Sequence, residues 1–321
     1  MAANGKPSGD PGRLDDAARA GWLYYVAGNT QDDIARKLGV SRQSAQRLVS
    51  LAVSERLIKV RLDHPIGRCM DLAQDLKQKF DLRMCEIVPS DPAAPDLLTG
   101  VAIAAAAEME RVLKSPDEKI IALGTGRALK ACVEQLPQMS CPQHRIVSRL
   151  GNMMSDGSAT PYNAVIRMAD RVGAQHYPFP LPVLARDAAE LNVLHEQEAV
   201  KNTIALCARA DLTLVGIGQI TETAPMVLDG FLPLDELGAL EKAGAAGEIT
   251  SWIYDETGAL VDCPHNRRVA SAPLSVAQGK LMVAVAVGQA KLRALTAALQ
   301  GGLINGVITN EGMAQALLRR G

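Results

Sequence analysis

Apolar residues between positions 30 and 54 recur at helical spacing in two short runs. The first run contains Ile34, Ala35 and Leu38, and the second contains Ala45, Leu48, Val49, Ala52 and Val53. Thr30, with Asp33 three residues later, forms a capping-box pattern, and Ser41 stands at a second N-cap. Gly39 stands where a left-handed C-cap is favoured. The pattern predicts two helices joined by a tight turn.

The outer side of the second predicted helix is polar and has no acid. A recognition helix needs such side chains near its N-terminus to reach base edges and phosphates in the major groove. The alternative is an ordinary helical hairpin with a solvated face. Because the turn, the caps and the polar face agree in register, we predict a helix-turn-helix that binds DNA. The residues expected to contact DNA are Thr30, Gln31, Ser41, Arg42, Gln43, Ser44, Gln46 and Arg47.

The charge of the chain restricts DNA binding to a local surface. The formal net charge of the 321 residues is −1, so the protein is not globally basic. Residues 36–61 nevertheless carry seven basic side chains against the single acid Glu55: Arg36, Lys37, Arg42, Arg47, Arg56, Lys59 and Arg61. This segment is the predicted electrostatic footprint.

The flanking segments suggest the domain organisation. Residues 1–12 are rich in glycine, proline and small polar residues, and we expect a flexible tail. Residues 14–27 form a predicted helix with the aromatic residues Trp22, Tyr24 and Tyr25. These are expected to pack beneath the helix-turn-helix, with direct DNA contact as the lesser alternative. Residues 56–62 alternate basic and apolar positions, which predicts a short strand acting as a wing. The predicted domains are therefore 13–63, which binds DNA, and 64–321.

From residue 84 onward, short apolar runs alternate with helical stretches. The strand candidates are 84–88, 119–124, 145–150, 174–180, 212–218, 248–255, 282–288 and 303–309. The helical stretches are about 68–80, 96–114, 127–136, 161–172, 188–209, 289–299 and 311–319. Hydrophobic residues make up 48% of the chain, enough for a substantial core. The alternation predicts an α/β domain whose mostly parallel, Rossmann-like sheet is covered on both faces.

Cysteine and histidine positions indicate neither a metal site nor a disulfide framework. The six cysteines lack a CxxC pair, and the five histidines lack an HExxH pattern. We expect buried, reduced thiols, no metal and no cofactor. No signal peptide and no apolar run of membrane-spanning length is present, so we expect a cytoplasmic location and no membrane partner.

Open α/β sheets bind ligands beyond the carboxyl ends of their strands, and several predicted loops there are polar or rich in glycine. The candidate binding residues in these loops are Gly124, Thr125, Gly126, Arg127, Arg149, Gly151, Asn152, Gly218, Gln219, Asp255, Lys291 and Asn310. Lys291 begins a helix, where the dipole disfavours a cation, so a bound phosphate or carboxylate would account for it. Plain alternatives exist: connecting turns around Gly124 and Asp255, a helix cap for Asn310, and a solvated Lys291.

None of these loops predicts catalysis. The sequence contains no nucleophile elbow, no GxxxxGK[ST] phosphate loop and no His–carboxylate pairing at metal spacing. The Gly124 loop lacks the third glycine of GxGxxG, because Leu129 stands in its place. The residues favour a binding site, with no catalytic residues.

Several long motifs resemble the SorC family of bacterial sugar-responsive transcriptional regulators, over about residues 14–320. They are LYYVAGNTQDDIARKLGVSRQSAQRLVSLAVSERLIKVRL, the GTGR loop after KIIAL, ADLTLVGIG, EITSWIYDETGALVD, and VAVGQAKLRALTAALQGGLINGVITNEGMAQALL. The last motif, about 35 residues in family order, is more specific than any single loop.

The resemblance implies that residues 64–321 form an effector-binding and oligomerisation domain, similar to sugar-phosphate isomerase and deaminase folds but used for binding. It implies a homotetramer on operator DNA, controlled by a small carbohydrate (a sugar, polyol or phosphosugar) and governing carbohydrate uptake or catabolism genes. Carried over by position, the effector site comprises the Gly124–Arg127 loop, the Gly151 loop, Gly218 with Gln219, and, at three other strand ends, Asp255, Lys291 and Asn310.

Two positions depart from the family pattern. The last strand usually ends in Thr-Asp and here ends in Thr309-Asn310, and the usual second glycine after Gly151 is Asn152. The loss of an acid at 310 would make an anion easier to hold beside Lys291.

Two other function classes make different demands on the sequence. A sugar-phosphate isomerase or deaminase with an added DNA-binding domain would need a general acid and base at the strand ends. Only Asp255 and Glu311 are acids near the predicted loops, and no histidine accompanies them, so we predict that the protein is not an enzyme. A partner-binding protein, whose α/β domain only oligomerises, would not respond to carbohydrates.

Overall fold

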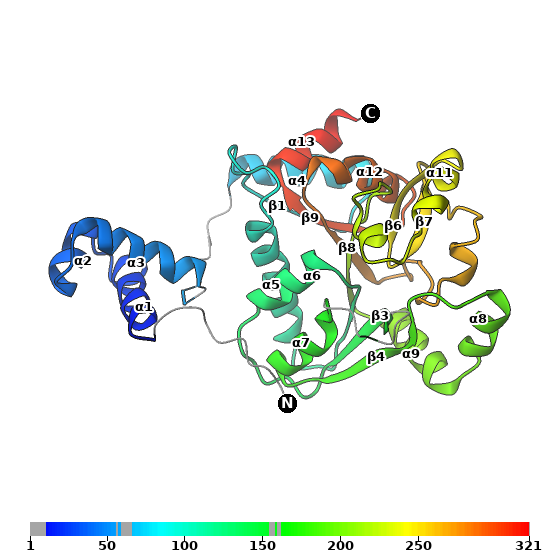
Figure 1. Cartoon of the computed structure of the whole chain (residues 1–321), viewed down its shortest axis with the longest axis horizontal. Helices are drawn as coiled ribbons and strands as arrows, with labels where there is room; N and C mark the ends of the chain where they lie inside the picture. The colour runs from blue at the N-terminus through cyan, green and yellow to red at the C-terminus, as the bar shows by residue number, and fades with distance from the viewer. Residues whose placement is uncertain (1–10, 56, 59–65, 154–157, 159–161, 321) are drawn as a thin grey trace. The chain divides into compact units, whose positions relative to one another are not determined.

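The computed structural model describes residues 11–55, 57–58, 66–153, 158 and 162–320 (Figure 1). The chain divides into two compact units, residues 1–64 and 65–321. Residues 1–10 of the predicted tail lie outside the described residues, and residues 11–12 belong to the first helix. The predicted wing strand, 56–62, also lies outside them except for residues 57 and 58.

The smaller unit contains the helices α1 (Pro11–Tyr25), α2 (Gln31–Leu38) and α3 (Arg42–Ser54). Thr30 caps α2: its hydroxyl accepts the Asp33 N–H, and the Asp33 carboxylate accepts the Thr30 N–H. Gly39 ends α2 with a φ of 68°, and Ser41 Oγ accepts the Ser44 N–H at 3.1 Å to begin α3. The two predicted helices and their caps are thus confirmed.

Small residues hold α1 against α3. Ala17, Ala20 and Ala52 are fully buried, and a Cβ added to Gly21 would lie 2.7 Å from the Ala52 Cβ. This close approach leaves no room for aromatic rings between the helices. The predicted packing of the α1 aromatics beneath the unit is therefore wrong: Trp22, Tyr24 and Tyr25 are 54%, 38% and 42% exposed.

The larger unit is built on one seven-stranded sheet in which every pairing is parallel. In spatial order, its strands are β1 (Met84–Val88), β9 (Gly306–Asn310), β8 (Leu281–Val285), β5 (Leu212–Gly216), β2 (Ile120–Leu123), β3 (Arg145–Met153) and β4 (Gln175–Pro182). At its centre, Ile121 of β2 pairs with Ile146 of β3 and Leu212 of β5. The predicted α/β class with a mostly parallel sheet is confirmed.

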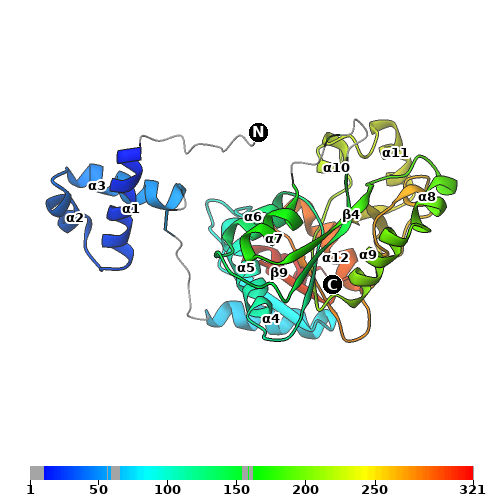
Figure 2. The same cartoon turned by 90° about the horizontal axis from the view of Figure 1, so that it is seen from below.

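Helices cover both faces of this sheet (Figures 1 and 2). One face packs against α5 (Thr99–Leu113), α6 (Arg127–Gln135) and α7 (Ala164–Val172). The other packs against α4 (Gly67–Phe80), α9 (Glu198–Arg209), α12 (Leu292–Gln300) and α13 (Glu311–Arg319). Neighbouring residues of β5 serve opposite faces, with Leu214 in the first core and Val215 in the second. Burial on both faces explains why the strands read as continuous apolar runs.

The order of strands reverses between β2 and β5. From β2 the chain moves outward through β3 to β4, whereas from β5 it moves the other way through β8 to β9. The loops that follow β2 and β5 therefore leave in opposite directions. Such a switch point opens a crevice at the carboxyl ends of the strands.

The segment 248–255, predicted as one strand, is a hairpin instead. It contributes to β6 (Ala245–Ile249) and β7 (Trp252–Asp255), which form a separate antiparallel pair. Thr250 and Ser251 turn the chain between them with φ values of 50° and 72°. The prediction of a single strand was wrong because neither turn residue is a glycine or asparagine, the usual signals of left-handed backbone.

The remaining elements lie around this sheet and hairpin. The predicted helix 188–209 is divided into α8 (Ala188–His195) and α9, with a break at residues 196–197. The short elements are α10 (Pro225–Leu228), α11 (Leu234–Lys242) and the 3₁₀ turns η1 (Asn266–Arg268) and η2 (Gln289–Lys291).

Candidate functional site

A cavity of about 160 Å³ opens at the switch point. It is lined by Thr125, Gly126, Arg127, Ala128, Leu150, Gly151, Tyr162, Val183, Gly216, Ile217, Gly218, Gln219, Pro225, Met226, Asp229, Phe231, Glu248, Thr250, Ser251 and Lys291. We call it the switch-point cavity. A cavity of about 150 Å³ in another protein binds benzene, so this one has room for a ligand of about that size.

The loop after β2 supplies backbone donors to one side of the cavity. Gly126 has a φ of 110°, which favours glycine, and a Cβ there would meet nothing within 4 Å. Helix α6 begins at Arg127 without a side-chain cap, so its first N–H groups are available to an anion. Thr125 Oγ1 donates to the Tyr162 carbonyl at 3.2 Å, which holds this loop against the segment before α7.

Glu248 of β6 forms the floor of the cavity beside the loop that follows β5. Its backbone exchanges two hydrogen bonds with Gly218, at 2.9 and 3.0 Å. A Cβ on residue 218 would lie 2.7 Å from the Glu248 Cδ. A glycine at position 218 therefore allows the Glu248 carboxyl group to lie across the end of β5. The Ser251 N–H then donates to Glu248 Oε2 at 3.0 Å.

Two carboxyl groups, those of Asp229 and Glu248, and two cations, those of Arg127 and Lys291, line this cavity. Burial raises the pKa of Glu248, while the Ser251 N–H and the charge of Lys291 oppose the rise. Burial lowers the pKa of Lys291; Glu248 opposes this effect and Arg127 adds to it. The arrangement offers a hydrogen-bonding carboxyl group together with positive charge at the start of α6.

Two polar atoms in the cavity lack protein partners. Gln219 Oε1 and Thr250 Oγ1 are both buried without a hydrogen bond to the described residues. Buried polar atoms are nearly always satisfied in folded proteins, so these two lining residues are candidates for hydrogen bonds to a hydroxylated or aminated ligand. Apolar side chains also line the cavity: Leu150, Val183, Pro225, Met226 and Phe231.

Seven predicted binding residues line this one cavity. They are Thr125, Gly126, Arg127, Gly151, Gly218, Gln219 and Lys291. They come from loops after β2 and β5, from β3 and from the turn after β8, and the parallel sheet brings these ends to one edge.

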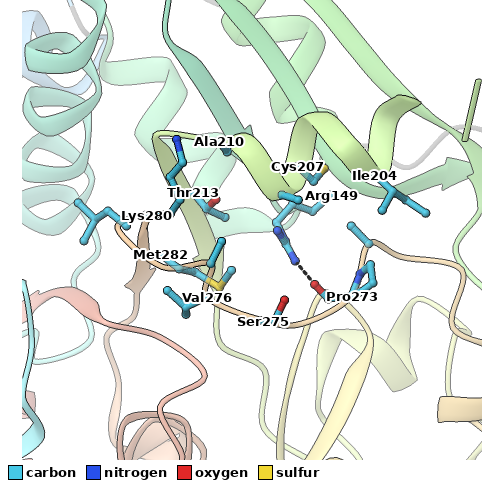
Figure 3. A pocket seen from close by; sticks show the side chains of 14 residues that line it. Arg149, Ile204, Cys207, Ala210, Thr213, Pro273, Ser275, Val276, Lys280 and Met282 are labelled. Atoms are coloured by element: carbon cyan, nitrogen blue, oxygen red, sulfur yellow. Dashed lines mark hydrogen bonds between the residues drawn. The ribbon is translucent and has the colours of Figure 1, made fainter. Parts of the chain in front are cut away.

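Four of the other predicted effector residues lie outside the lining: Gly124, Arg149, Asp255 and Asn310. Gly124 is buried behind the loop, where its N–H donates to the Leu214 carbonyl at 2.8 Å. Asn152 belongs to β3, and its side chain lies outside the described part of the chain. Arg149 faces a second cavity on the other side of β3 (Figure 3).

Asp255 and Asn310 have structural partners instead. The Asp255 carboxylate accepts hydrogen bonds from Thr257 N, Thr257 Oγ1 and Ala259 N, and these lower its pKa and close a turn after β7. Asn310 Oδ1 caps α13 by accepting the Met313 N–H at 3.0 Å, and its Nδ2 donates to the Pro95 carbonyl at 2.8 Å. The contacts of Asp255 are those of the connecting turn, and the contacts of Asn310 are those of the helix cap, that the sequence offered as alternatives to ligand binding.

The sequence pattern predicts neither Glu248 nor the apolar residues of the lining. It places Glu248, Thr250 and Ser251 in a strand and gives the segment containing α10 no role. One signal was present: Glu248 is an acid inside the apolar run from Ala245 to Ile253, where a buried acid needs a partner.

The predicted DNA-contacting residues lie together on the N-terminal part of α3 and at the start of α2. Two of these residues, Gln31 and Ser44, are half-buried. The exposed ones are Thr30, Ser41, Arg42, Gln43, Gln46 and Arg47. Thr30, Ser41 and Ser44 also serve as cap partners. Arg42 forms an exposed ion pair with Asp32 at 3.5 Å.

Other chemistry finds little support in the described part of the chain. Within it, no group of three or more His, Cys, Asp or Glu side chains is placed to hold a metal ion. All six cysteines are buried free thiols, as predicted. None of the described helices is long and apolar enough to cross a membrane.

Comparison with known proteins places the chain among bacterial regulators. Residues 64–319 match the family described as "Putative sugar-binding domain". The erythritol catabolism regulatory protein EryD of Brucella abortus is 32% identical over 94% of this chain and 96% of its own length. The sorbitol operon regulator of Klebsiella pneumoniae is 28% identical over 92% and 95%. The crystal structure of full-length SorC from the same organism covers 95% of this chain and 99% of its own, with a TM-score of 0.68 and 25% identity.

Proposed function

We propose that the switch-point cavity binds the carbohydrate effector of this protein, since the chain belongs to the SorC family and is a sugar-responsive transcriptional regulator. The observation that carries this proposal is the group of unpaired or electrostatically coupled polar side chains in one cavity: Gln219, Thr250, Glu248 and Lys291. A ligand with several hydroxyl groups can satisfy all of them at once.

The cavity offers two chemically different sets of polar groups. Glu248, Gln219 and Thr250 suit hydroxyl groups, because they offer acceptors and one hydroxyl group. Arg127, Lys291 and the N-terminus of α6 suit a phosphate. The proposed effector classes are therefore a sugar or polyol, such as the erythritol and sorbitol named in the relatives, or a phosphosugar.

We propose that α3 reads the operator through Arg42, Gln43, Ser44, Gln46 and Arg47. Thr30, Gln31 and Ser41 would make further contacts at the helix starts. The exposure of the long side chains and the absence of an acid among them support this role. In a homo-oligomer, which we propose to be a tetramer, the effector would favour the geometry it binds more tightly, and so change the spacing of recognition helices. Such a regulator would act in the cytoplasm.

A panel of thermal shifts tests the effector site. Wild-type protein is heated with neutral sugars and polyols and with their phosphorylated counterparts, beside Glu248→Gln and Arg127→Ala. Binding in this cavity predicts that Glu248→Gln weakens every active ligand, and that Arg127→Ala weakens only phosphorylated ones. Arg186→Ala, a change at an exposed arginine outside the lining, serves as the control. The assignment fails if Glu248→Gln responds to an active ligand as wild type does.

A gel-shift with the protein's own upstream DNA tests the recognition helix. The double variant Arg42→Ala, Arg47→Ala is expected to lose most of its affinity, and Arg186→Ala should bind as wild type. Equal binding by all three proteins would show that α3 is not the reading element.

We further propose that the cavity binds its ligand without turnover. Glu248 has the raised pKa of a candidate base, but no histidine is among the described residues that line the cavity. The acids near the predicted loops have other partners, because Asp255 closes its turn and Glu311 accepts the Ser90 N–H at 3.0 Å. Conversion of any candidate phosphosugar by the purified protein would support the isomerase or deaminase alternative.

A further inference from the structure

A second cavity, of about 110 Å³, lies against the face of the sheet covered by α9 (Figure 3). It is lined by Arg149, Ile204, Cys207, Ala208, Ala210, Thr213, Ala272, Pro273, Ser275, Val276, Ala277, Lys280, Leu281 and Met282. No residue is shared with the switch-point cavity. We call it the α9 cavity. Adjacent residues of β3 face the two spaces, Arg149 the α9 cavity and Leu150 the other.

Arg149 is a buried cation with unused hydrogen-bonding capacity. Its side chain reaches into the α9 cavity, and the residue is only 2% exposed (Figure 3). One Nη2 proton is donated to the Pro273 carbonyl at 2.7 Å, while Nε is buried with no hydrogen-bond partner in the described part of the chain. Burial lowers the pKa of Arg149, as expected for a charge removed from water. A guanidinium group keeps its charge even so.

The charge balance of the cavity specifies the partner that Arg149 lacks. Among the described residues, Arg149 forms no ion pair, and the only other cation in the lining, Lys280, is paired with Asp211 at 3.1 Å. One positive charge is therefore uncompensated. A buried charge is stable only when it is paired and hydrogen-bonded. The complement is a ligand with one negative charge and an oxygen that accepts from Nε.

The walls limit the rest of the ligand. Nine of the lining residues have apolar side chains other than cysteine: Ile204, Ala208, Ala210, Ala272, Pro273, Val276, Ala277, Leu281 and Met282. These walls disfavour a doubly charged phosphate, which stays strongly hydrated. The volume is below the roughly 150 Å³ that holds benzene, so only a few carbon atoms fit. Thr213 and Ser275 can meet one additional hydroxyl group.

We propose that the α9 cavity binds a small organic monocarboxylate, of about three carbon atoms, as a second ligand of this regulator. One carboxylate oxygen accepts a hydrogen bond from Arg149 Nε, and the short carbon chain packs between α9 and residues 272–277. The site is separate from the proposed carbohydrate site and does not depend on it.

A purely structural role for Arg149 is the competing explanation. Arg149 already joins β3 to the 272–273 segment, through its Pro273 hydrogen bond and through its own carbonyl, which accepts the Ala272 N–H at 2.8 Å. That role accounts for Nη2 but leaves Nε unpaired. A substitution of Arg149 would disturb the fold under either explanation, so the test changes the rim of the cavity instead.

Isothermal calorimetry on the full chain tests the proposal with sodium propionate and sodium lactate, against propionamide and sodium phosphate at matched ionic strength. We expect the carboxylates to bind, and propionamide and phosphate to give no saturable heat. Ala208→Phe, which fills the cavity from an exposed position on α9, should weaken carboxylate binding at least tenfold. Ala205→Phe, also exposed on α9 but outside the lining, should bind as wild type.

Three outcomes would overturn the proposal. They are the absence of carboxylate binding to wild type, equal binding of propionamide, and carboxylate binding that survives in Ala208→Phe. Loss of carboxylate binding in Arg127→Ala, with Ala208→Phe unaffected, would assign the anion to the switch-point cavity instead. Failure of the proposed carbohydrate site would leave this test unchanged, since its variants and ligands are different.

Discussion

His265 holds the strained turn residue Ser251 in place beneath the switch-point cavity. Its Nε2 lies 3.0 Å from the Ser251 carbonyl oxygen, so this nitrogen must carry the proton. Nδ1 is buried and has no hydrogen-bond partner among the residues that the structure describes, and burial lowers the pKa of His265 to about 4. Ser251 has a φ of 72°, and its N–H supports Glu248. A neutral histidine is therefore built into the support of the proposed effector site.

The protein should lose stability as the pH falls, because His265 must stay neutral in the fold. Its folded pKa of about 4 lies below the reference value of 6.5, so its contribution is complete above pH 6.5 and is lost as the pH falls through 4. The full loss is about 3 kcal/mol of unfolding free energy. Glu248 acts in the opposite sense, because its pKa is raised in the folded protein. Its protonated form favours folding, so its contribution to the unfolding free energy is lost as the pH rises.

Comparison of variants isolates the histidine contribution. Urea unfolding at several pH values should give a flatter profile for His265→Gln than for wild type, whereas His176→Gln, at an exposed histidine, should keep the wild-type slope. Identical slopes for wild type and His265→Gln would mean that His265 does not titrate differently in the fold.

Gly218→Ala should damage effector binding. The new Cβ would displace the Glu248 carboxyl group, which lies across residue 218. We expect at least tenfold weaker binding of the active carbohydrate and a loss of about 1–3 kcal/mol in stability. Thermal shift with the ligand panel measures both effects. Gly238→Ala, within α11 where a Cβ meets nothing within 4 Å, should gain about 0.5–1 kcal/mol and keep the response. A normal response in Gly218→Ala would contradict this geometry.

Thr30→Ala should loosen the smaller unit without affecting the larger one. It removes the acceptor of the Asp33 N–H and half of the capping box, at a cost of about 1 kcal/mol. Hydrogen exchange of the α2 amides in the full chain should become faster by about fivefold. Thr30→Ser keeps the hydroxyl and should exchange almost as wild type. If Thr30→Ser and Thr30→Ala exchange alike, the cap is not what stabilises α2.

Arg47→Ala should reduce the salt dependence of DNA binding. If the exposed Arg47 guanidinium contacts a phosphate, the Arg47→Ala variant releases about one counterion fewer than wild type when it binds DNA. The slope of log affinity against log salt should then become about one unit shallower per lost contact. Fluorescence anisotropy at four salt concentrations measures the slope, with Arg186→Ala as reference. An unchanged slope with lower affinity at every salt concentration would point to base contact instead.

The elements of the larger unit were predictable, but their order in the sheet was not. Apolar runs such as 212–218 and 282–288 mark buried strands, because both faces are covered. Neither run, however, indicates which strands lie beside it in the sheet. That β5 pairs with both β2 and β8, which creates the switch point, depends on contacts between residues far apart in the sequence.

The candidate site could be predicted only in part, again because it depends on contacts between residues far apart in the sequence. Glycine loops after β2 and β5 signal close backbone approach, and Gly126 and Gly218 do line the cavity. Glu248 reaches the cavity only because Thr250 and Ser251, both ordinary strand residues, adopt left-handed backbone. In the smaller unit, caps and apolar spacing predicted α2 and α3, whereas the exposure of Trp22 depended on how closely α1 approaches α3.

The burial of all six cysteines leaves the surface open to selective labelling. A cysteine placed at Ser50, an exposed position on α3, would be far more accessible to a thiol reagent than the native ones. A spin label there would report the distance between the α3 helices of two copies in an assembly, and hence whether a ligand alters that distance. The native chain can be used for this measurement without replacing any of its own cysteines.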